Sequence, residues 1–386
     1  MEFDLSEEHR MLQESVAGFA GREIQPIAEE IDKRDEWPEG LWKKLADLGI
    51  MGISVDPAYG GAGADILAAC LACEELAKVS AAVALSWGAH ANLCCNNLNH
   101  NASEAQKAKY LPPLCAGDHI GALGLTEPNA GSDAVSISTV ARKEGDRYVV
   151  NGTKTFITNG PVADTIVLYA KTDKSLGARG ITAFILDTKF PGFSVSRKLE
   201  KVGNRGSLTG ELVMEDCLIP AENILGRENG GIAVMMGGLD VERAFFSGYA
   251  LGIAEAAFTE AVKYAKERVQ FGKPIGSFQL IQAKLADMFA QIESAKLLAY
   301  KAAVMAGGAE RGGKGTTVHQ ISAAAILLAA ETACKVTEEA VQIHGGYGYC
   351  LEYPVQRYWR DAKLGTIGAG TSEMRRLIVA RELLSM

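Results

Sequence analysis

The stretch GALGLTEPNAGSD, residues 121–133, has the residue types of a ligand-binding turn. An apolar run leads into a polar turn that contains glycine, so backbone groups can approach a flat ligand closely there. Gly131 permits unusual backbone angles, and Ser132 adds a hydroxyl beside exposed amides, an arrangement suited to a pyrophosphate. Ordinary loops have the same turn chemistry. The stretch is therefore a candidate phosphate site that needs support from elsewhere in the chain.

Cysteine is the second residue type that could do chemistry, and the chain has eight. Cys70, Cys73, Cys94 and Cys95 are spaced as metal ligands can be, yet they lie in Ala/Leu-rich helical sequence without a nearby His/Asp constellation. Free cysteine is also a common small core residue. We therefore predict reduced core thiols and no metal site, with the same role for the isolated residues Cys115, Cys217, Cys334 and Cys350.

Three zones of different hydrophobic period must position these residues. Up to about residue 117 the period is helical, with predicted helices at 19–31, 41–48, 66–76 and 81–98. From 121 to about 226 the period approaches two, with predicted strands at 147–150, 154–158, 165–170, 181–186 and 212–214. Helical periodicity then returns, with long candidates at 234–268, 278–307, 316–345 and 372–384.

The order helical, β, helical predicts an α+β multidomain chain with domains at 1–117, 118–228 and 229–386. A Rossmann dehydrogenase is disfavoured because no GxGxxG follows a predicted strand. The pair Asn151-Gly152 lies between two of the β runs, and Asn-Gly supplies the positive φ angles of a type I′ turn. We therefore predict that RYVVNGTKTFITNG forms a β-hairpin.

Composition narrows the functional classes. A chain of 386 residues exceeds what one core usually serves, so two or three packed parts are expected. A net charge of −8 without concentrated Lys/Arg argues against a nucleic-acid binder. No signal core and no run of about 20 uninterrupted apolar residues is visible, so we expect no membrane span. We expect a soluble protein of the bacterial cytoplasm, or of the mitochondrial matrix if this is a mature eukaryotic chain.

Five motifs together resemble the acyl-CoA dehydrogenase family. The stretch at 121–133 resembles its flavin-binding signature, and four further runs resemble other signatures in the family's order and spacing: KTFITNG (154–160), RVQFGKPIGSFQ (268–279), QIHGGYGY (342–349) and RDAKLGTIGAGTS (360–372). The resemblance implies an N-terminal helical domain, a middle antiparallel β domain and a C-terminal four-helix bundle. It also implies a homotetramer with one FAD per subunit, an acyl-CoA substrate and electron-transfer flavoprotein as the partner.

The resemblance assigns the cofactor contacts. Leu125 and Thr126 would meet the isoalloxazine edge, with Gly131 and Ser132 near the flavin and CoA phosphates. Phe156 and Thr158 would cover the ring, since an aromatic face stacks on a flavin. The residues implied to surround the adenosine diphosphate part of FAD, partly in the neighbouring subunit, are Arg268, Phe271, Gln279, Gln342, Gly346, Thr371 and Glu373.

The reaction implied by the family is oxidation of a thioester between Cα and Cβ, with flavin N5 accepting the Cβ hydride. It needs a base for the Cα proton and donors for the thioester oxygen. Most of the family places a Glu directly before Gly-Thr in the last motif, where this chain has Ala369. A minority, including the isovaleryl type, places the base on the helix that opens the C-terminal domain, which here assigns Glu242. A surface helix carboxylate is the alternative for Glu242 on its residue type alone.

The neighbours of Glu242 support the same assignment. Glu242 precedes the apolar stretch AFFSGYALGI, so we predict a desolvated carboxyl with a raised pKa. The backbone N–H of Ala369 and a flavin ribityl hydroxyl would bind the thioester oxygen. Arg243 would position CoA or order the base, because its guanidinium stays charged.

The acyl group is predicted to be short and branched, with isovaleryl favoured. Gly368 and Ala369 leave space beside Cβ, and LSWGAHANLC at 85–94, beginning with Leu85, resembles the isovaleryl-type helix that lines the acyl pocket. Trp87 departs from that type, so isobutyryl, 2-methylbutanoyl and alicyclic groups stay open. No Lys or Arg lies within 81–98, which disfavours an acyl chain with a second carboxylate. Oxidase or non-oxidative elimination chemistry on the same scaffold, and a catalytically silent flavin- or CoA-binding protein, are the rival functions.

Overall fold

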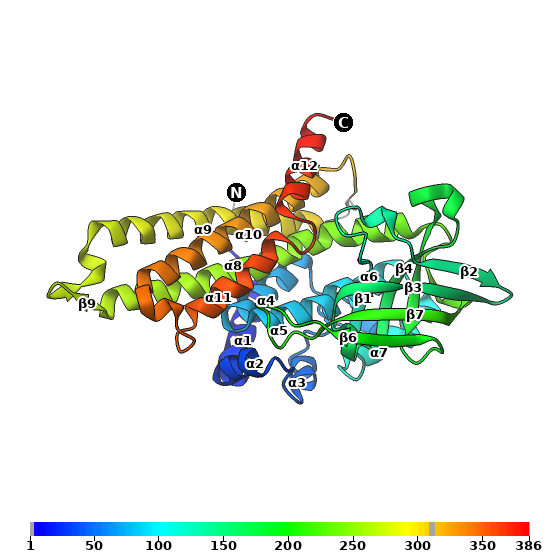
Figure 1. The fold of residues 1–386 in the computed structure, drawn as a ribbon, viewed down its shortest axis with the longest axis horizontal. Coiled ribbons are helices and arrows are strands. Elements are labelled where there is room, and N and C mark those ends of the chain that lie inside the picture. Colours follow the sequence, from blue (N-terminus) through cyan, green and yellow to red (C-terminus); the bar gives the residue numbers. More distant parts are fainter. Residues whose placement is uncertain (1–3, 309–312, 386) are drawn as a thin grey trace.

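Along the chain a mixed β-sheet follows one helical part and precedes another, and in the computed structural model, which describes residues 4–308 and 313–385, the sheet lies at one end of the molecule (Figure 1). The first helical part consists of α1 (Glu7–Phe19), α2 (Ala28–Arg34), α3 (Leu41–Asp47), α4 (Ile66–Val79), α5 (Ala81–Gly88), α6 (Asn97–Asn101) and α7 (Glu104–Cys115). A π-helical stretch, Ala89–Asn96, joins α5 to α6. The predicted helix over 81–98 is therefore present with a change of helical register in its second half.

Side-chain caps set where several helices begin. The Asp65, Ser80 and Ser103 side chains accept hydrogen bonds from the first-turn amides of α4, α5 and α7. Such caps satisfy backbone N–H groups that have no partner inside the helix. Short polar residues in the sequence thus fix where α4, α5 and α7 begin.

The middle part is a sheet of eight strands. Its strands are β1 (Gly121–Gly124), β2 (Val140–Glu144), β3 (Arg147–Thr158), β4 (Thr165–Lys171), β5 (Ile181–Asp187), β6 (Phe193–Lys198), β7 (Thr209–Pro220) and β8 (Ile224–Leu225). The order is β6-β7-β3-β2-β4-β5-β8, and β1 pairs with β4. Most strand pairs are antiparallel, as predicted for this domain, but β1 and β2 both run parallel to β4, so the sheet is mixed.

The predicted hairpin at Asn151-Gly152 was wrong, because β3 runs unbroken through both residues. The turn lies earlier, at Gly145-Asp146, where Glu144 pairs with Arg147 and Gly145 has φ 63°. At Asn151 the register between β3 and β7 shifts instead, and the Asn151 side chain exchanges two hydrogen bonds with Asp216. A β-bulge uses the same residue type as a turn, so the local signal did not separate the two.

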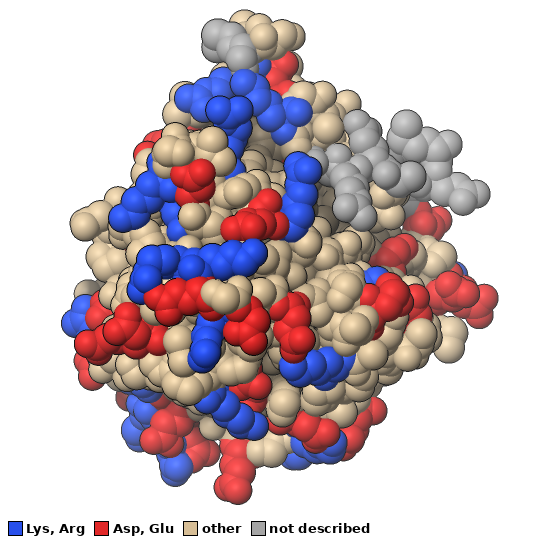
Figure 2. All heavy atoms as spheres, turned by 90° about the vertical axis from the view of Figure 1, so that its right-hand side faces the viewer, with Lys and Arg blue, Asp and Glu red and all other residues tan. Residues whose placement is uncertain are grey.

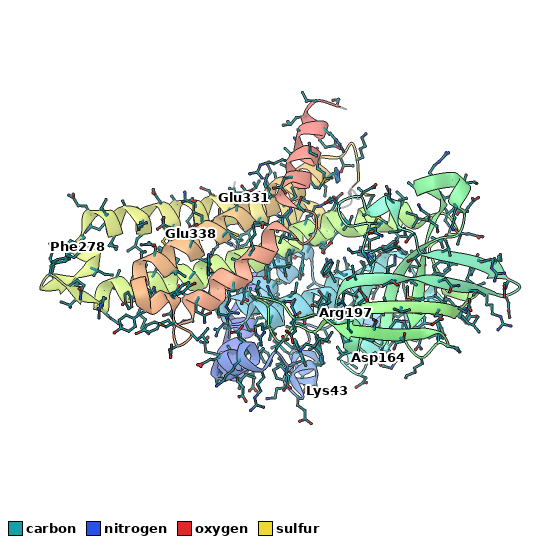
Figure 3. The ribbon with its side chains drawn as sticks, in the orientation of Figure 1. Lys43, Asp164, Arg197, Phe278, Glu331 and Glu338 are labelled. Atoms are coloured by element: carbon teal, nitrogen blue, oxygen red, sulfur yellow. The ribbon has the colours of Figure 1, made fainter. Side chains whose placement is uncertain are left out.

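The C-terminal part is a bundle of long helices followed by two short ones. It contains α8 (Gly231–Glu267), the small ladder β9 (Val269–Gln270) and β10 (Lys273–Pro274), α9 (Gln279–Ala306), α10 (Thr317–His344), α11 (Val355–Ala362) and α12 (Ser372–Leu383). The sheet and the β9–β10 ladder lie at opposite ends of the molecule (Figure 1). Phe278, at the start of α9, marks the ladder end (Figure 3).

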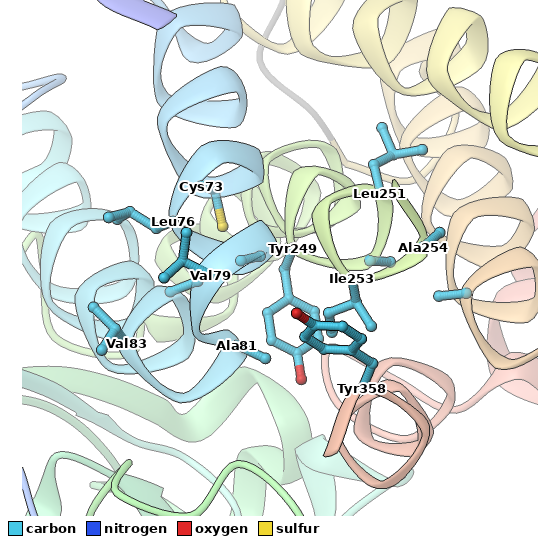
Figure 4. Close-up of a cluster of buried hydrophobic side chains, with 14 of the residues drawn as sticks. Cys73, Leu76, Val79, Ala81, Val83, Tyr249, Leu251, Ile253, Ala254 and Tyr358 are labelled. Atoms are coloured by element: carbon cyan, nitrogen blue, oxygen red, sulfur yellow. The ribbon is translucent and has the colours of Figure 1, made fainter. Parts of the chain in front are cut away.

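Helix α8 packs closely on α4, which fixes its position. A Cβ at Gly248 would lie 2.3 Å from the Cys70 carbonyl oxygen, and one at Gly252 would lie 2.2 Å from that of Glu74. Only glycine permits this approach. Figure 4 shows the apolar cluster around the contact, including Tyr249 and Tyr358.

Helix α10 is the one described segment, extended to Thr317–Tyr349, that is long and apolar enough to cross a membrane by length and composition. It packs between α8, α9 and α12. More than half of its most apolar window is buried inside the protein, at 56%. The core of a helix bundle accounts for such a composition.

Most cysteines are core residues, as predicted. Six are buried, Cys334 is half-buried, and all eight are free thiols. Burial raises the pKa of Cys217 to about 11 and that of Cys94 to about 12. Cys350 is exposed, so the core role predicted for it was wrong.

Candidate active site

Helix α8 carries Glu242 to the wall of a small cavity between the sheet and the first helical part. The cavity is lined from four segments, namely the π-helical stretch and α6, β1 and its continuation, β4, and α8. Its lining residues are Asn92, Leu93, Asn96, Asn97, Leu123, Leu125, Tyr169, Met235, Gly238, Leu239 and Glu242. Glu242 is the only carboxylate among them, so it is the group in this cavity that can take up a proton.

The environment of Glu242 makes it a stronger base than an ordinary carboxylate. Burial raises the pKa of Glu242 to about 7, while the positive charges of Arg243 and Arg375 oppose the increase. Desolvation penalises the charged form, which is the effect predicted from the apolar sequence after this residue. A base with a pKa close to neutral pH is well matched to proton abstraction.

Arg243 links α8 to the loop that contains Ala369. Its Nη1 donates to Asp240 Oδ1 at 2.8 Å, and its Nε reaches the Ala369 carbonyl oxygen at 3.5 Å. Asp240 also bonds His319 Nδ1 at 2.7 Å. Asp240 is fully buried in these contacts and does not line the cavity. The guanidinium of Arg243 therefore orders the site through its contacts with Asp240 and the Ala369 carbonyl.

The Gly368-Ala369-Gly370 loop has an unusual backbone. Ala369 has φ 55° and Gly370 has φ 94°, and a non-glycine residue in the left-handed region is strained. Within the described ranges 4–308 and 313–385, the Ala369 N–H has no hydrogen-bond partner. A Cβ at Gly368 would meet only ordinary contacts, the nearest at 3.6 Å. The loop therefore offers a free N–H donor with open space beside it.

A buried ion pair holds the segment after β1. Lys154 Nζ donates to Glu127 Oε1 at 2.8 Å and to the Leu125 carbonyl at 3.0 Å. Glu127 also accepts from the backbone N–H groups of Ser138 and Thr139. Burial lowers the pKa of Lys154 to about 8, against the effect of Glu127. Although burial alone would raise the pKa of Glu127, Lys154 and the two hydroxyl residues lower it to about 2.

The other residues of the predicted flavin face lie on the same part of the sheet. The Thr126 carbonyl accepts from Thr155 N at 2.9 Å, which ties this segment to β3. Phe156 is 69% exposed and has φ 59°, and Thr158 ends the strand. A large aromatic held exposed at a strained position is typical of a ligand contact.

Gly131 does not use the left-handed backbone angles that glycine permits. It is absent from the residues with positive φ, and a Cβ added there would meet nothing within 4 Å. Gly131 and Ser132 are both exposed. Glycine is therefore not required sterically at 131 in this chain, and Ser132 is free to meet a ligand.

A second hollow lies at the far end of α8, near β9. This groove has a volume of about 450 Å³ and is lined by Arg268 and Gly346, together with Tyr264, Gln270, Ile275, Ile343, His344, Gly345, Tyr347 and Cys350. The Arg268 guanidinium lies 5.3 Å from the Tyr347 ring centroid. Phe271 is 92% exposed with φ 53°. Gln279 and Gln342 are exposed on α9 and α10.

Thr371 and Glu373 do not line this groove, although the motifs grouped them with it. Thr371 is the N-cap of α12, where its Oγ1 accepts from Met374 N at 3.3 Å, and Glu373 lies in the first turn. Both therefore lie next to the Ala369 loop. Within one chain, the residues predicted to bind FAD thus form two separate groups.

The acyl-pocket residues predicted from 85–94 are divided between core and cavity. Leu85 is half-buried in the main core, and Trp87 is fully buried with its Nε1 donating to the Ile50 carbonyl at 3.0 Å. Neither lines the Glu242 cavity. His90 is a core residue, because its Nδ1 accepts from Gly121 N at 2.9 Å. Burial lowers the pKa of His90 to about 3.

Sequence reasoning did not find the polar side of the cavity. Asn92, Asn96, Asn97 and Tyr169 line it, and the buried Asn96 Oδ1 has no hydrogen-bond partner among the described residues. Asn92 and Asn96 belong to the π-helical stretch, which often occurs at functional sites. The run NNLNHN at 96–101, which overlaps the end of the predicted helix 81–98, was the available signal.

Comparison with known proteins covers the whole chain. Models of the acyl-CoA dehydrogenase N-terminal, middle and C-terminal domains match residues 6–118, 122–217 and 229–384. The chain is 47% identical over 381 residues to the mitochondrial isovaleryl-CoA dehydrogenase of Pongo abelii. This match covers 98% of this chain and 89% of that protein.

Two solved structures have the same fold along their full length. Butyryl-CoA dehydrogenase from Megasphaera elsdenii is 45% identical with a TM-score of 0.95, and both chains are covered completely. A chain from work on the electron transferring flavoprotein of Acidaminococcus fermentans is 44% identical with a TM-score of 0.96, again with complete coverage of both. The chain therefore belongs to the acyl-CoA dehydrogenase family and is a flavin-dependent oxidoreductase.

Proposed function

We propose that this protein oxidises a short branched acyl-CoA, with isovaleryl-CoA favoured, to the 2-enoyl-CoA, and that Glu242 removes the Cα proton. The observation that carries the proposal is a carboxyl with its pKa raised to about 7 that is the one carboxylate among the described residues lining its cavity. Ala369 stands where most of the family has its base, so the chemistry needs a base from elsewhere.

The residues of the chain would divide the work as follows. Glu242 takes the proton, and the free N–H of Ala369 binds the thioester oxygen as that oxygen gains negative charge. Arg243 contacts the Ala369 carbonyl and Asp240, so it orders the loop. FAD, when bound, supplies the acceptor for the two electrons that leave with the Cβ hydrogen.

The described residues fit FAD in two separated groups. Arg268 follows Glu242 by 26 residues, from 242 to 268, which is about 39 Å along the α8 axis. One cofactor cannot contact both ends of this helix in a single chain. We therefore propose that Leu125, Thr126 and Phe156 of one subunit and the Arg268 groove of another hold the same FAD, within a homotetramer. An arginine that lines an open groove suits a pyrophosphate, because its guanidinium can bind two phosphate oxygens at once.

Exposed apolar side chains support the oligomer. Phe271 and Leu280 are 92% and 81% exposed, and Phe289, Leu297 and Val304 are exposed along α9. Single exposed apolar residues are ordinary, but a row along one helix indicates an interaction site.

On the face in Figure 2, acidic and basic side chains are intermixed, without a continuous basic area.

Several observations support a neutral, short acyl group. No lysine or arginine lines the described part of the Glu242 cavity, so a second carboxylate would lack a partner. The similarity to isovaleryl-CoA dehydrogenase supports a branched chain, and that to butyryl-CoA dehydrogenase makes a straight C4 chain the alternative. The similarity to the Acidaminococcus chain supports electron-transfer flavoprotein as the electron acceptor.

A panel of C4 to C8 straight, branched and alicyclic acyl-CoAs tests the substrate. We expect the fastest anaerobic bleaching of the flavin with isovaleryl-CoA, because open space at Gly368 and Ala369 accepts a branch near Cβ. The kcat/KM for isovaleryl-CoA should exceed that for butyryl-CoA by about 10-fold or more, which is the scale on which an apolar pocket distinguishes substrates that differ by one carbon. Preference for a straight C8 chain would contradict the branched pocket, and hydrogen peroxide release on rapid reoxidation by air would indicate an oxidase.

The pH dependence tests the state of Glu242. Because the raised pKa keeps Glu242 protonated below about 7, the rate of flavin reduction should rise with pH and level off above an inflection near 7. Arg243, Arg375 and Tyr169 are the other charged or titratable groups near Glu242. Stopped-flow reduction between pH 5 and 9 measures the inflection. A rate already constant from about pH 5, as for an ordinary glutamate, would contradict the assignment.

A further inference from the structure

Arg375 is a buried arginine that forms no direct salt bridge among the described residues, although the charges of Glu242 and Glu331 act on it. It is fully buried on α12, and its Nε has no hydrogen-bond partner among the residues that the structure describes. Its Nη1 donates to the Gly365 carbonyl at 2.8 Å, and its Nη2 donates to the Gly368 carbonyl. Burying an unpaired cation is unfavourable, so stability alone does not explain this residue.

Both carbonyls belong to the segment that leads into the strained loop. Gly368 directly precedes Ala369, whose φ of 55° persists only where the surroundings enforce it. Arg243 contacts the next carbonyl, that of Ala369. Two guanidinium groups therefore donate hydrogen bonds to the carbonyls of Gly368 and Ala369, while the Ala369 N–H has no partner in the described part of the chain.

We propose that Arg375 is a positioning residue of this active site, holding the carbonyls of Gly365 and Gly368 so that the Ala369 N–H stays in place for the thioester oxygen. The proposal rests on the proposed function, in which this N–H binds that oxygen. The oxygen gains charge as the Cα proton leaves, and fixed donors stabilise such charge without reorganisation. The positive charge of Arg375 also opposes the rise in the pKa of Glu242 that burial causes.

Two substitutions separate the fork of hydrogen bonds from the charge. Arg375→Lys keeps the charge and loses the planar fork, whereas Arg375→Gln loses the charge. Arg376→Gln is the matched control, because Arg376 is the exposed neighbour and pairs with Glu331 at 2.7 Å. For each variant we would measure flavin reduction per bound FAD, its pH profile, and the carbonyl stretch of a bound enoyl-CoA labelled with carbon-13 at the thioester.

The expected results differ between the variants. Both Arg375 variants should reduce their FAD about 10²-fold more slowly than wild type, the scale of losing one oxyanion donor, and the carbonyl stretch should move towards that of the free thioester. Only Arg375→Gln should move the pH inflection upward, because only it removes a charge near Glu242. Arg376→Gln should match wild type in all three measurements.

Three outcomes would overturn the proposal. They are rates per FAD within threefold of wild type, an unchanged carbonyl stretch in both variants, and failure of both variants to fold with FAD, which would make Arg375 a residue of the fold alone. The wild-type protein tests the proposed function separately. If its FAD is reduced by the acyl-CoA and it binds the enoyl thioester, these three outcomes count against the role of Arg375 and not against the proposed function.

Discussion

Glu242→Gln should lower the rate of flavin reduction by acyl-CoA by at least about 10³-fold while leaving the fold, the FAD content and the oligomer intact. The amide is nearly isosteric with the carboxyl but cannot accept the Cα proton. Substrate affinity should change little, because the carboxyl binds no other described group. Anaerobic stopped-flow reduction and gel filtration of the yellow protein measure the two parts of this result.

Two further variants sharpen this test. Glu215→Gln, on the exposed part of β7, should reduce its FAD at the wild-type rate. Ala369→Glu in the Glu242→Gln background should recover part of the activity, since most of the family has its base at that position. A near-normal rate of flavin reduction in the Glu242→Gln variant would show that another residue is the base. Asp240, the nearest other carboxylate in sequence, is already bonded to Arg243 and His319.

Lys154→Met should destabilise the protein by about 3–5 kcal/mol, because it leaves the buried Glu127 carboxylate without its cation. Lys154 also bonds the Leu125 carbonyl, so the segment predicted to meet the flavin should loosen and FAD should dissociate more readily. Urea unfolding of the FAD-loaded protein and the FAD content after dialysis measure these two effects.

The matched control is Lys143→Met, an exposed residue on β2, which should change the stability by less than about 0.5 kcal/mol. The double variant Lys154→Met/Glu127→Gln should be more stable than Lys154→Met, because a neutral amide costs less to bury than an unpaired charge. Equal stability of Lys154→Met and wild type would show that the pair does not hold this segment.

Local pattern predicted most of the helices and strands, because each depends on residues close in sequence, whereas the assignment of Glu242 as the base came from the family resemblance. The period of three to four predicted α8, and the apolar residues after Glu242 predicted the direction of its pKa shift, which the structure confirms. The prediction of a turn at Asn151-Gly152 was wrong because Asn151 lies in a β-bulge, where its side chain bonds Asp216, which is 65 residues away in sequence.

The supporting residues of the site could not be predicted from local sequence. In the sequence Arg375 is one of three arginines in the predicted helix 372–384, and only its bonds to Gly365 and Gly368 distinguish it. Asn96 faces the cavity because the π-helical stretch changes the register after Gly88. Such contacts depend on tertiary packing, which overrides local preference.

Exchange of the Cα hydrogen tests the role of Glu242 most directly. Protein and isovaleryl-CoA would be incubated anaerobically in deuterium oxide, and deuterium at Cα would be followed by mass spectrometry. We predict deuterium incorporation with wild-type protein and with Glu215→Gln, and incorporation at least about 10³-fold slower with Glu242→Gln at equal bound substrate. Equal incorporation by wild type and Glu242→Gln would show that another group removes this proton.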